Sequence, residues 1–126
     1  MQHILIVDDH FGIRVLLEQR LQELGFKVET CSSGKEALLK LLSSRPELIL
    51  MDIKMPEMGG IEALRLITRF CPEIPVIMMS AYSETDEVRE AREKGNFVYY
   101  VEKPFYLNEV TDLIKKILKT KNSPET

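Results

Sequence analysis

Short runs of apolar residues alternate with longer amphipathic stretches along the chain. The apolar runs have the length and composition of buried β-strands, whereas the stretches between them have the spacing of helices with one apolar face. Strands are expected at residues 4–7, 26–31, 48–51, 76–79 and 97–101. Helices are expected at residues 11–24, 34–44, 60–70, 84–94 and 106–119. This alternation predicts a parallel sheet with helices on both faces.

Turn and capping residues agree with these boundaries. Gly25 and Gly95 stand where two helices should end, because glycine readily adopts the left-handed backbone conformation of a helix C-terminus. Ser33 and Glu36 have the spacing of a capping box at the start of the second helix. We therefore predict an α/β fold, with five helices doubly wound around a five-stranded parallel sheet in the flavodoxin-like order 2-1-3-4-5.

Length and composition indicate one ordinary globular domain. The chain has 126 residues, of which 44% are hydrophobic and 29% charged, which argues against intrinsic disorder and against a second core. The net charge is −3 with both signs interspersed, which argues against direct nucleic-acid binding. Residues 1–119 are expected to form the domain, and the polar residues 120–126 a flexible tail.

Membrane and secretion signals are missing from the sequence. No apolar run reaches the length of a membrane span, and the first residues lack the basic start of a secretory signal. We therefore expect a cytoplasmic protein with no membrane contact. Cys31 and Cys71 match neither a disulfide framework nor a metal-binding pair, so both are expected to be buried, reduced thiols.

Polar residues follow the carboxyl ends of four predicted strands. Asp8 and Asp9 follow the first strand, Asp52 the third, Ser80 the fourth and Lys103 the fifth. In a doubly wound sheet, ligands bind at this edge, and the order 2-1-3-4-5 makes these strands neighbours. A single aspartate after a strand is usually a loop or cap residue, but the joint pattern favours one functional site.

Three carboxylates that converge on one crevice repel one another, so a cation is expected among them. Ligation by oxygen atoms alone favours Mg²⁺ or Mn²⁺ over zinc, which prefers cysteine and histidine. With a cation and Lys103 in place, the site has the parts for phosphoryl transfer. Asp52 is the expected nucleophile and Ser80 the hydroxyl donor.

The residues around this site carry a family resemblance. Residues 3–119 resemble the receiver domains of two-component response regulators, which supports the predicted fold. The matching segments are ILIVDD at residues 4–9, LILMDIKMP at 48–56, MMSA at 78–81 and EKPF at 102–105, whose Lys-Pro bond is usually cis in this family. The resemblance implies that a histidine kinase or phosphotransferase phosphorylates Asp52, in a reaction that the receiver itself catalyses with Mg²⁺ and without turnover as a hydrolase.

The resemblance also implies roles for individual residues. Asp9, Asp52 and the backbone carbonyl of Lys54 would bind Mg²⁺ directly, and Asp8 would act through water. Lys103 would contact the phosphoryl group.

A second implied feature is a switch that reports phosphorylation. Ser80 would bind a phosphoryl oxygen in the active state, and an aromatic residue would change rotamer with it. The segment between Gly95 and Lys103 is one residue longer than is usual in the family. Counting back from Lys103 assigns this aromatic to Tyr100, our preferred interpretation, whereas counting forward from Gly95 assigns it to Tyr99.

Residues 8–17 and Lys54 look most similar to single-domain regulators of the sporulation phosphorelay. That similarity implies a monomer whose partners are a histidine kinase and a helical-bundle histidine phosphotransferase. Leu16 lies off the helical stripe that should face the sheet, so it is a candidate for partner contact. We expect a docking patch beside the site, made by Phe11, Ile13, Leu16, Pro104 and Phe105.

Other functions remain open at this level. Within the family, the chain could act by phosphorylation-dependent binding, as chemotaxis receivers do, or be part of a longer transcriptional regulator. A haloacid-dehalogenase-like hydrolase would need Asp-x-Asp after the first strand, whereas Asp8 and Asp9 are adjacent. A flavodoxin-like cofactor carrier is disfavoured because these carboxylates would repel a phosphate.

Overall fold

The computed structural model describes residues 2–55, 58–81, 86–93 and 97–121, and in them strands and helices alternate along the chain. The strands are β1 (His3–Val7), β2 (Lys27–Cys31), β3 (Leu48–Asp52), β4 (Val76–Ser80) and β5 (Val98–Glu102). The helices are α1 (Phe11–Glu23), α2 (Gly34–Leu41), α3 (Gly60–Phe70), α4 (Asp86–Glu93) and α5 (Leu107–Lys121). The ten predicted elements are therefore all present.

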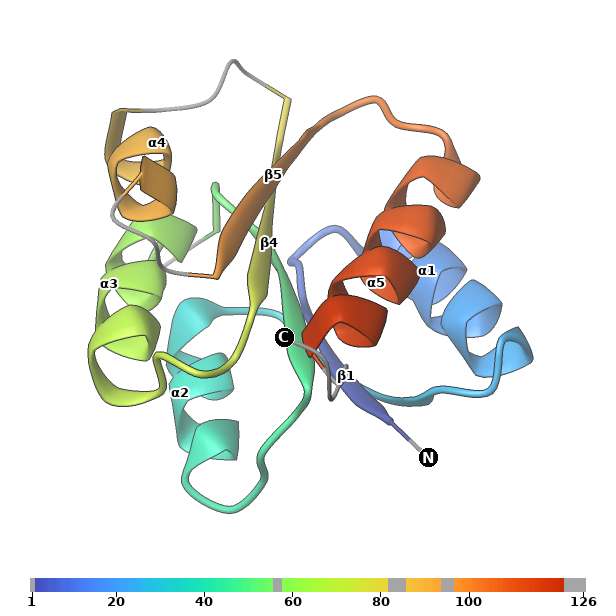
Figure 1. Ribbon diagram of the computed structural model, residues 1–126, viewed down its shortest axis with the longest axis horizontal. Helices are drawn as coiled ribbons and strands as arrows, with labels where there is room; N and C mark the ends of the chain where they lie inside the picture. The colour runs from blue at the N-terminus through green and yellow to red at the C-terminus, as the bar shows by residue number, and fades with distance from the viewer. Residues whose placement is uncertain (1, 56–57, 82–85, 94–96, 122–126) are drawn as a thin grey trace.

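The strands form one parallel sheet in the order β2-β1-β3-β4-β5, which confirms the predicted topology. Helices α1 and α5 cover one face, and α2, α3 and α4 cover the other (Figure 1). The register pairs Val7 with Met51 and Asp52 with Met79. The carboxyl ends of β1, β3 and β4 therefore lie side by side at one edge of the sheet.

Side chains alternate between two apolar layers, one on each face of the sheet. Leu5 and Val7 of β1 pack in the layer under α2, α3 and α4, whereas Ile4 and Ile6 pack in the layer under α1 and α5. Every residue of β1, β3 and β4 is buried, as expected for central strands covered on both faces. This double burial fixes the register, because a slip by one residue would exchange the two layers.

Local signals explain most helix ends. Gly25 has φ of 93°, the left-handed conformation expected after α1. The Ser33 hydroxyl accepts the backbone N–H of Glu36, as in the predicted capping box, but the Glu36 carboxylate accepts the N–H of Ser32 rather than that of Ser33. Gly95 lies outside the described residues.

Two helices end at positions that the pattern did not predict. Helix α2 stops at Leu41 rather than residue 44, because the N–H groups of Leu42 and Ser43 bond to carbonyls three residues back and tighten the chain into a turn. Helix α5 continues to Lys121, so two residues expected in the tail are helical, and residues 122–126 lie outside the described part. Among the described helices, none is long and apolar enough to cross a membrane.

Helix α3 begins in close contact with the loop that follows β3. The N–H of Gly60 donates to the carbonyl of Ile53 at 2.9 Å. A Cβ atom at Gly60 would lie 2.9 Å from Ile53 Cα and closer still to the carbonyl oxygen of Asp52. At Gly59, the nearest atom to an added Cβ would be the Ile53 carbonyl oxygen at 3.6 Å, an ordinary contact.

We therefore expect Gly60→Ala to lower the free energy of unfolding by about 2–4 kcal/mol, because the backbone after Asp52 has to move. Gly59→Ala, the matched control, should cost less than about 1 kcal/mol. Urea unfolding of the two variants measures both values. Equal losses would show that the close approach at Gly60 is not the cause.

Candidate functional site

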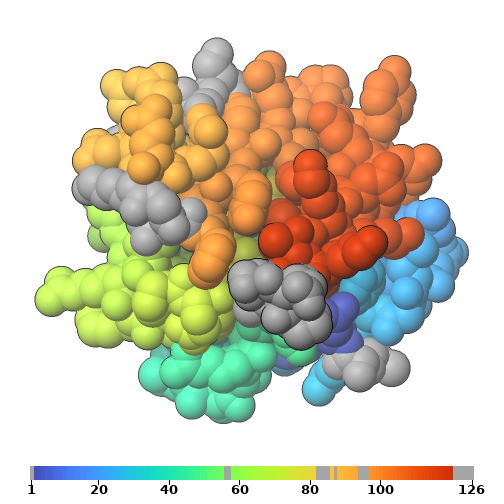
Figure 2. Space-filling model, in the orientation of Figure 1, coloured from blue at the N-terminus to red at the C-terminus, as the bar shows by residue number. Residues whose placement is uncertain are grey.

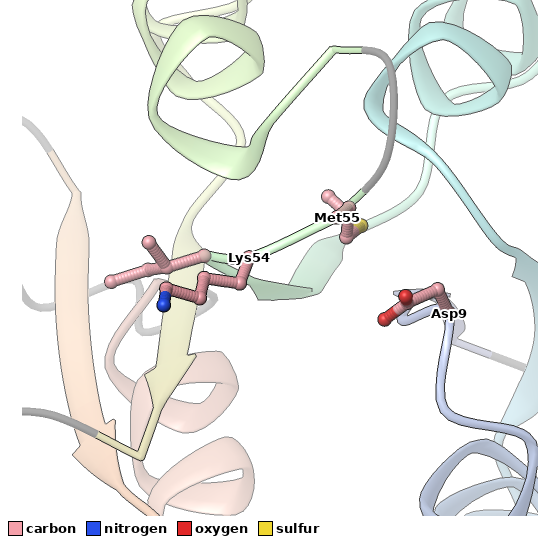
Figure 3. A pocket seen from close by; sticks show the side chains of 4 residues that line it. Asp9, Lys54 and Met55 are labelled. Carbon is pink, nitrogen blue, oxygen red and sulfur yellow. The ribbon is translucent and has the colours of Figure 1, made fainter.

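Three carboxylates meet at the carboxyl edge of the sheet. Asp8 and Asp9 follow β1 and Asp52 ends β3, and one oxygen of each lies within 4.8 Å of the others. Asp8 and Asp52 are buried, whereas Asp9 is exposed. Asp9 also lines an open cavity of about 560 Å³ with Ile53, Lys54 and Met55 of the loop after β3. Figure 3 shows the Asp9 carboxylate across this cavity from Lys54 and Met55.

The ammonium group of Lys103 bridges two of these carboxylates. Its Nζ lies 3.1 Å from Asp52 Oδ1 and 3.3 Å from Asp8 Oδ2, and the side chain is only 16% exposed. The backbone N–H of Lys103 donates to the carbonyl of Ser80, which ties the end of β5 to β4. The long side chain then spans from β5 to the ends of β3 and β1. The bond to Pro104 is cis, as the family resemblance implied.

Burial and charge act together on the ionisation of this cluster. Burial raises the pKa of Asp52 above its usual value, the charges of Asp8 and Asp9 add to the rise, and Lys103 opposes it. Burial alone would lower the pKa of Lys103, but its hydrogen bond to Asp52 and the charges of Asp8 and Asp52 raise it overall. The ammonium therefore stays protonated at neutral pH. Three carboxylates beside one ammonium leave two negative charges, which favours binding of a divalent cation.

The donor set fits a hard divalent cation. All three side chains offer carboxylate oxygens, which are the ligands of Mg²⁺ in proteins. Two oxygens on one Mg²⁺ lie at most about 4.2 Å apart, because each bond is about 2.1 Å long. The three oxygens lie within 4.8 Å of one another, so the carboxylates are close enough to contact one ion directly or through water.

The loop between β1 and α1 is held in place by His10 and Arg14. The backbone N–H of His10 donates to Asp8 Oδ1 at 2.8 Å, and His10 Nδ1 accepts the N–H of Ile13 as the helix cap. Arg14 Nη1 donates to the backbone carbonyl of Asp8 at 2.9 Å, and its guanidinium lies over the Phe11 ring. These bonds orient Asp8. No sequence pattern marks either bond, because histidine is not one of the usual N-cap residues and the bond from Arg14 depends on the path of the loop.

Ser80 and the two candidate switch tyrosines lie on neighbouring strands. Ser80 is buried at the end of β4, where it pairs with Glu102 of β5. Tyr100 pairs with Met78 and packs in the layer under α2, α3 and α4, the sheet face that alternation along β4 also assigns to Ser80. Tyr99 packs in the opposite layer, under α1 and α5.

The residues of the expected docking patch differ in exposure. Phe11 is 70% exposed and Leu16 52% exposed on α1, and Pro104 is exposed after β5. Ile13 and Phe105 are half-buried and pack against the layer under α1 and α5. Only part of the patch is therefore open to a partner, and the rest also supports the core.

Comparison with known proteins agrees with this architecture. The family model described as "Response regulator receiver domain" matches residues 4–115. Sporulation initiation phosphotransferase F of Bacillus subtilis (strain 168) is 38% identical over 122 residues, which cover 97% of this chain and 98% of that protein. Regulatory protein AtoC of Escherichia coli (strain K12) is 37% identical over 118 residues, 94% of this chain, and the chain spans only 25% of AtoC.

A solved structure shows the same likeness in three dimensions. The response regulator TrrA from Thermotoga maritima, in complex with Mg(2+)-BeF, superposes with a TM-score of 0.81 at 34% identity. The match covers 93% of this chain and 99% of that one. The family match extends over most of the chain, and the sheet order agrees with it. This chain belongs to the family of response regulator receiver domains.

Proposed function

We propose that this receiver accepts a phosphoryl group on Asp52 from a histidine kinase and passes it to a histidine phosphotransferase in a phosphorelay. The observation that carries the proposal is the contact of Lys103 with both Asp52 and Asp8, beside the exposed Asp9. Similarity to sporulation initiation phosphotransferase F along nearly its whole length supports a relay role. Similarity to AtoC supports the alternative, in which the receiver controls a transcriptional regulator.

The chemistry follows from the position of the two central groups. A carboxylate oxygen of Asp52 attacks the phosphorus of a phosphohistidine, the P–N bond breaks, and the electron pair leaves with the imidazole nitrogen. The product is an acyl phosphate on Asp52. The Lys103 ammonium already lies 3.1 Å from Asp52, so it can bind the phosphoryl oxygens without a large rearrangement. Transfer to a phosphotransferase histidine is the reverse step, in which the P–O bond to Asp52 breaks and a P–N bond to the histidine forms.

A divalent cation completes the site in this proposal. Asp9, Asp52 and the backbone carbonyl of Lys54 would hold Mg²⁺, and Asp8 would contact it through water. When bound, the ion supplies positive charge to the phosphoryl oxygens. This charge is needed because the carboxylates outnumber the single ammonium and would otherwise repel the incoming phosphoryl group. The exposure of Asp9 leaves an approach for the ion from solvent.

Phosphorylation would be reported through Ser80 and Tyr100. The Ser80 hydroxyl would bond to a phosphoryl oxygen, and Tyr100 would change its rotamer as the serine moves. The shared sheet face of Ser80 and Tyr100 supports this choice over Tyr99. Val88 of α4 lies in the same apolar layer as Tyr100, so the change could reach that helix.

The docking patch would receive the helical partner. Phe11 follows Asp9 by two residues and Pro104 follows Lys103 directly, so both flank the acidic cluster. With Leu16, which lies five residues further along α1, they offer apolar contacts to a helix that carries the reactive histidine.

Incubation with Mg²⁺ and acetyl phosphate should add one phosphoryl group to the protein, because a small donor needs only the site itself. Intact-mass spectrometry measures the addition. Asp52→Asn is the matched control and should remain unmodified. Modification of both proteins to the same extent would contradict Asp52 as the acceptor, and modification of neither would contradict phosphoryl transfer altogether.

Without divalent cations, Asp52→Asn should raise Tm by a few degrees at pH 7, because it removes a buried charge from a cluster of like charges. A raised pKa means that the ionised Asp52 destabilises the fold at neutral pH. That effect disappears as the pH falls below the ordinary value of 3.8, where the residue is protonated in both states. The gain in Tm should therefore shrink with falling pH. Thermal melts in a chelator from neutral to acidic pH measure it, and a gain that grows in acid would contradict the assignment.

Leu16→Asp should abolish phosphoryl transfer from the cognate kinase, because it places a charge on an exposed apolar residue of the docking patch. It should leave phosphorylation by acetyl phosphate unchanged, because Leu16 lies outside the acidic cluster. Autophosphorylated histidine kinases from the same genome, assayed one at a time with the wild type, identify the cognate donor. Equal loss with both donors would show that Leu16 supports the site and not the partner contact. Gln19→Asp, at another exposed position of α1, is the control for the added charge.

A further inference from the structure

A second surface, far from the acidic cluster, lies between α2 and α3. The two helices pack beside each other on one face of the sheet, and Figure 2 shows them as neighbours on the outside of the molecule. Between them is a cavity of about 390 Å³, lined mainly by leucines together with Phe70, Arg45 and Cys71. Arg45 precedes β3 and Cys71 precedes β4, so the cavity opens near the amino ends of the strands. The acidic cluster is at the opposite edge.

Large apolar side chains stand exposed around this cavity. Leu42 and Phe70, which both line the cavity, are 82% and 67% exposed. The guanidinium of Arg69 lies over the Phe70 ring, 5.4 Å from its centroid, so the ring is supported although it faces solvent. A group of exposed apolar residues beside a preformed cavity is typical of a protein contact, and the proposed phosphoryl transfer gives these residues no role.

The rim of the cavity carries both signs of charge. Arg45 Nη1 donates to Cys71 Sγ at 2.8 Å and lies 3.4 Å from Glu73 Oε2. The Arg45 and Glu73 side chains are 62% and 60% exposed, so each can still meet a group on another molecule. In an interface with two-fold symmetry, the same patch must be complementary to itself. An arginine and a glutamate side by side satisfy this condition, whereas a partner of one charge sign would be repelled by one of them.

We propose that two copies of this chain associate through this α2–α3 surface in a two-fold symmetric dimer. Leu42 and Phe70 of one copy would pack against the cavity of the other, and Arg45 of each copy would meet Glu73 of its partner. The acidic cluster and the docking patch lie away from the α2–α3 surface, so both copies could still exchange phosphoryl groups. The dimer departs from the monomer expected from the family resemblance.

Sedimentation velocity of the full chain tests the proposal directly. The mass should rise from 14.6 kDa toward twice that value with increasing concentration, with a dissociation constant on the order of 10–100 µM. Leu42→Glu and Phe70→Glu should each keep the chain monomeric. Tyr106→Glu changes a residue that is 85% exposed elsewhere and should leave dimerisation intact. Circular dichroism and Tm show whether each variant is folded.

A mixing experiment distinguishes a contact between copies from one within the chain. Arg45→Glu and Glu73→Arg should each weaken self-association at least about 10-fold, because like charges then meet across the two-fold axis. An equimolar mixture should form heterodimers, since the new carboxylate of the first variant faces the new guanidinium of the second, and the unchanged Glu73 and Arg45 also meet. The ion pair within one chain cannot be restored in this way.

Three results would overturn the proposal. The first is a wild type that remains at 14.6 kDa up to about 1 mM, well above the expected dissociation constant. The second is a dimer that still forms in the folded variants Leu42→Glu and Phe70→Glu. The third is a mixture of the two charge variants that associates as weakly as each variant alone.

Discussion

The contact between one lysine and two buried carboxylates is the interaction on which the site depends. Asp8 and Asp52 lie at the ends of adjacent strands, and burial would make their joint ionisation costly without a nearby cation. Lys103 Nζ lies within hydrogen-bonding distance of both. A neutral residue at this position would leave two buried carboxylates without this positive charge. The positive charge of Lys103 that reduces the repulsion between the carboxylates also makes the cluster suitable for binding a phosphoryl group.

The sheet order is what makes this contact available. Lys103 comes from the end of β5, Asp52 from β3 and Asp8 from β1, so strands far apart in the sequence must be assembled in the right order. The two apolar layers fix that order and register, because every residue of the central strands is buried. Acidic residues of the three central strands occur only at or directly after their carboxyl ends. The packing of the core and the chemistry of the site are thus two consequences of one topology.

Much of this arrangement could be predicted from the sequence. Apolar periodicity predicted the elements, and the polar residues at strand ends predicted the convergence of Asp8, Asp9, Asp52 and Lys103, because parallel strands bring their carboxyl ends to one edge. These predictions succeeded because they depend on repeated local patterns. A ligand role for any one of these residues needs more than the pattern and has to be tested by metal binding.

Other features had no sequence signal of this kind. The bond from Arg14 to the carbonyl of Asp8 depends on the path of the loop, which spacing does not reveal. Periodicity indicates which face of a helix is buried, but it does not show that Ile13 and Phe105 are half-buried. It also does not show that the exposed Leu42, directly after α2, lines the same cavity as Phe70 of α3, because these residues are far apart in the sequence.

Titration of the metal-free chain with Mg²⁺ in a calorimeter tests the central claim most directly. The account predicts saturable binding of one ion per chain, lost in Asp9→Asn, because this substitution removes a negative charge and one of the proposed carboxylate ligands. Calcium should bind with a different affinity from magnesium, since it prefers more ligands at longer distances. A wild type that binds no Mg²⁺ at millimolar concentrations, while fully folded, would contradict the account.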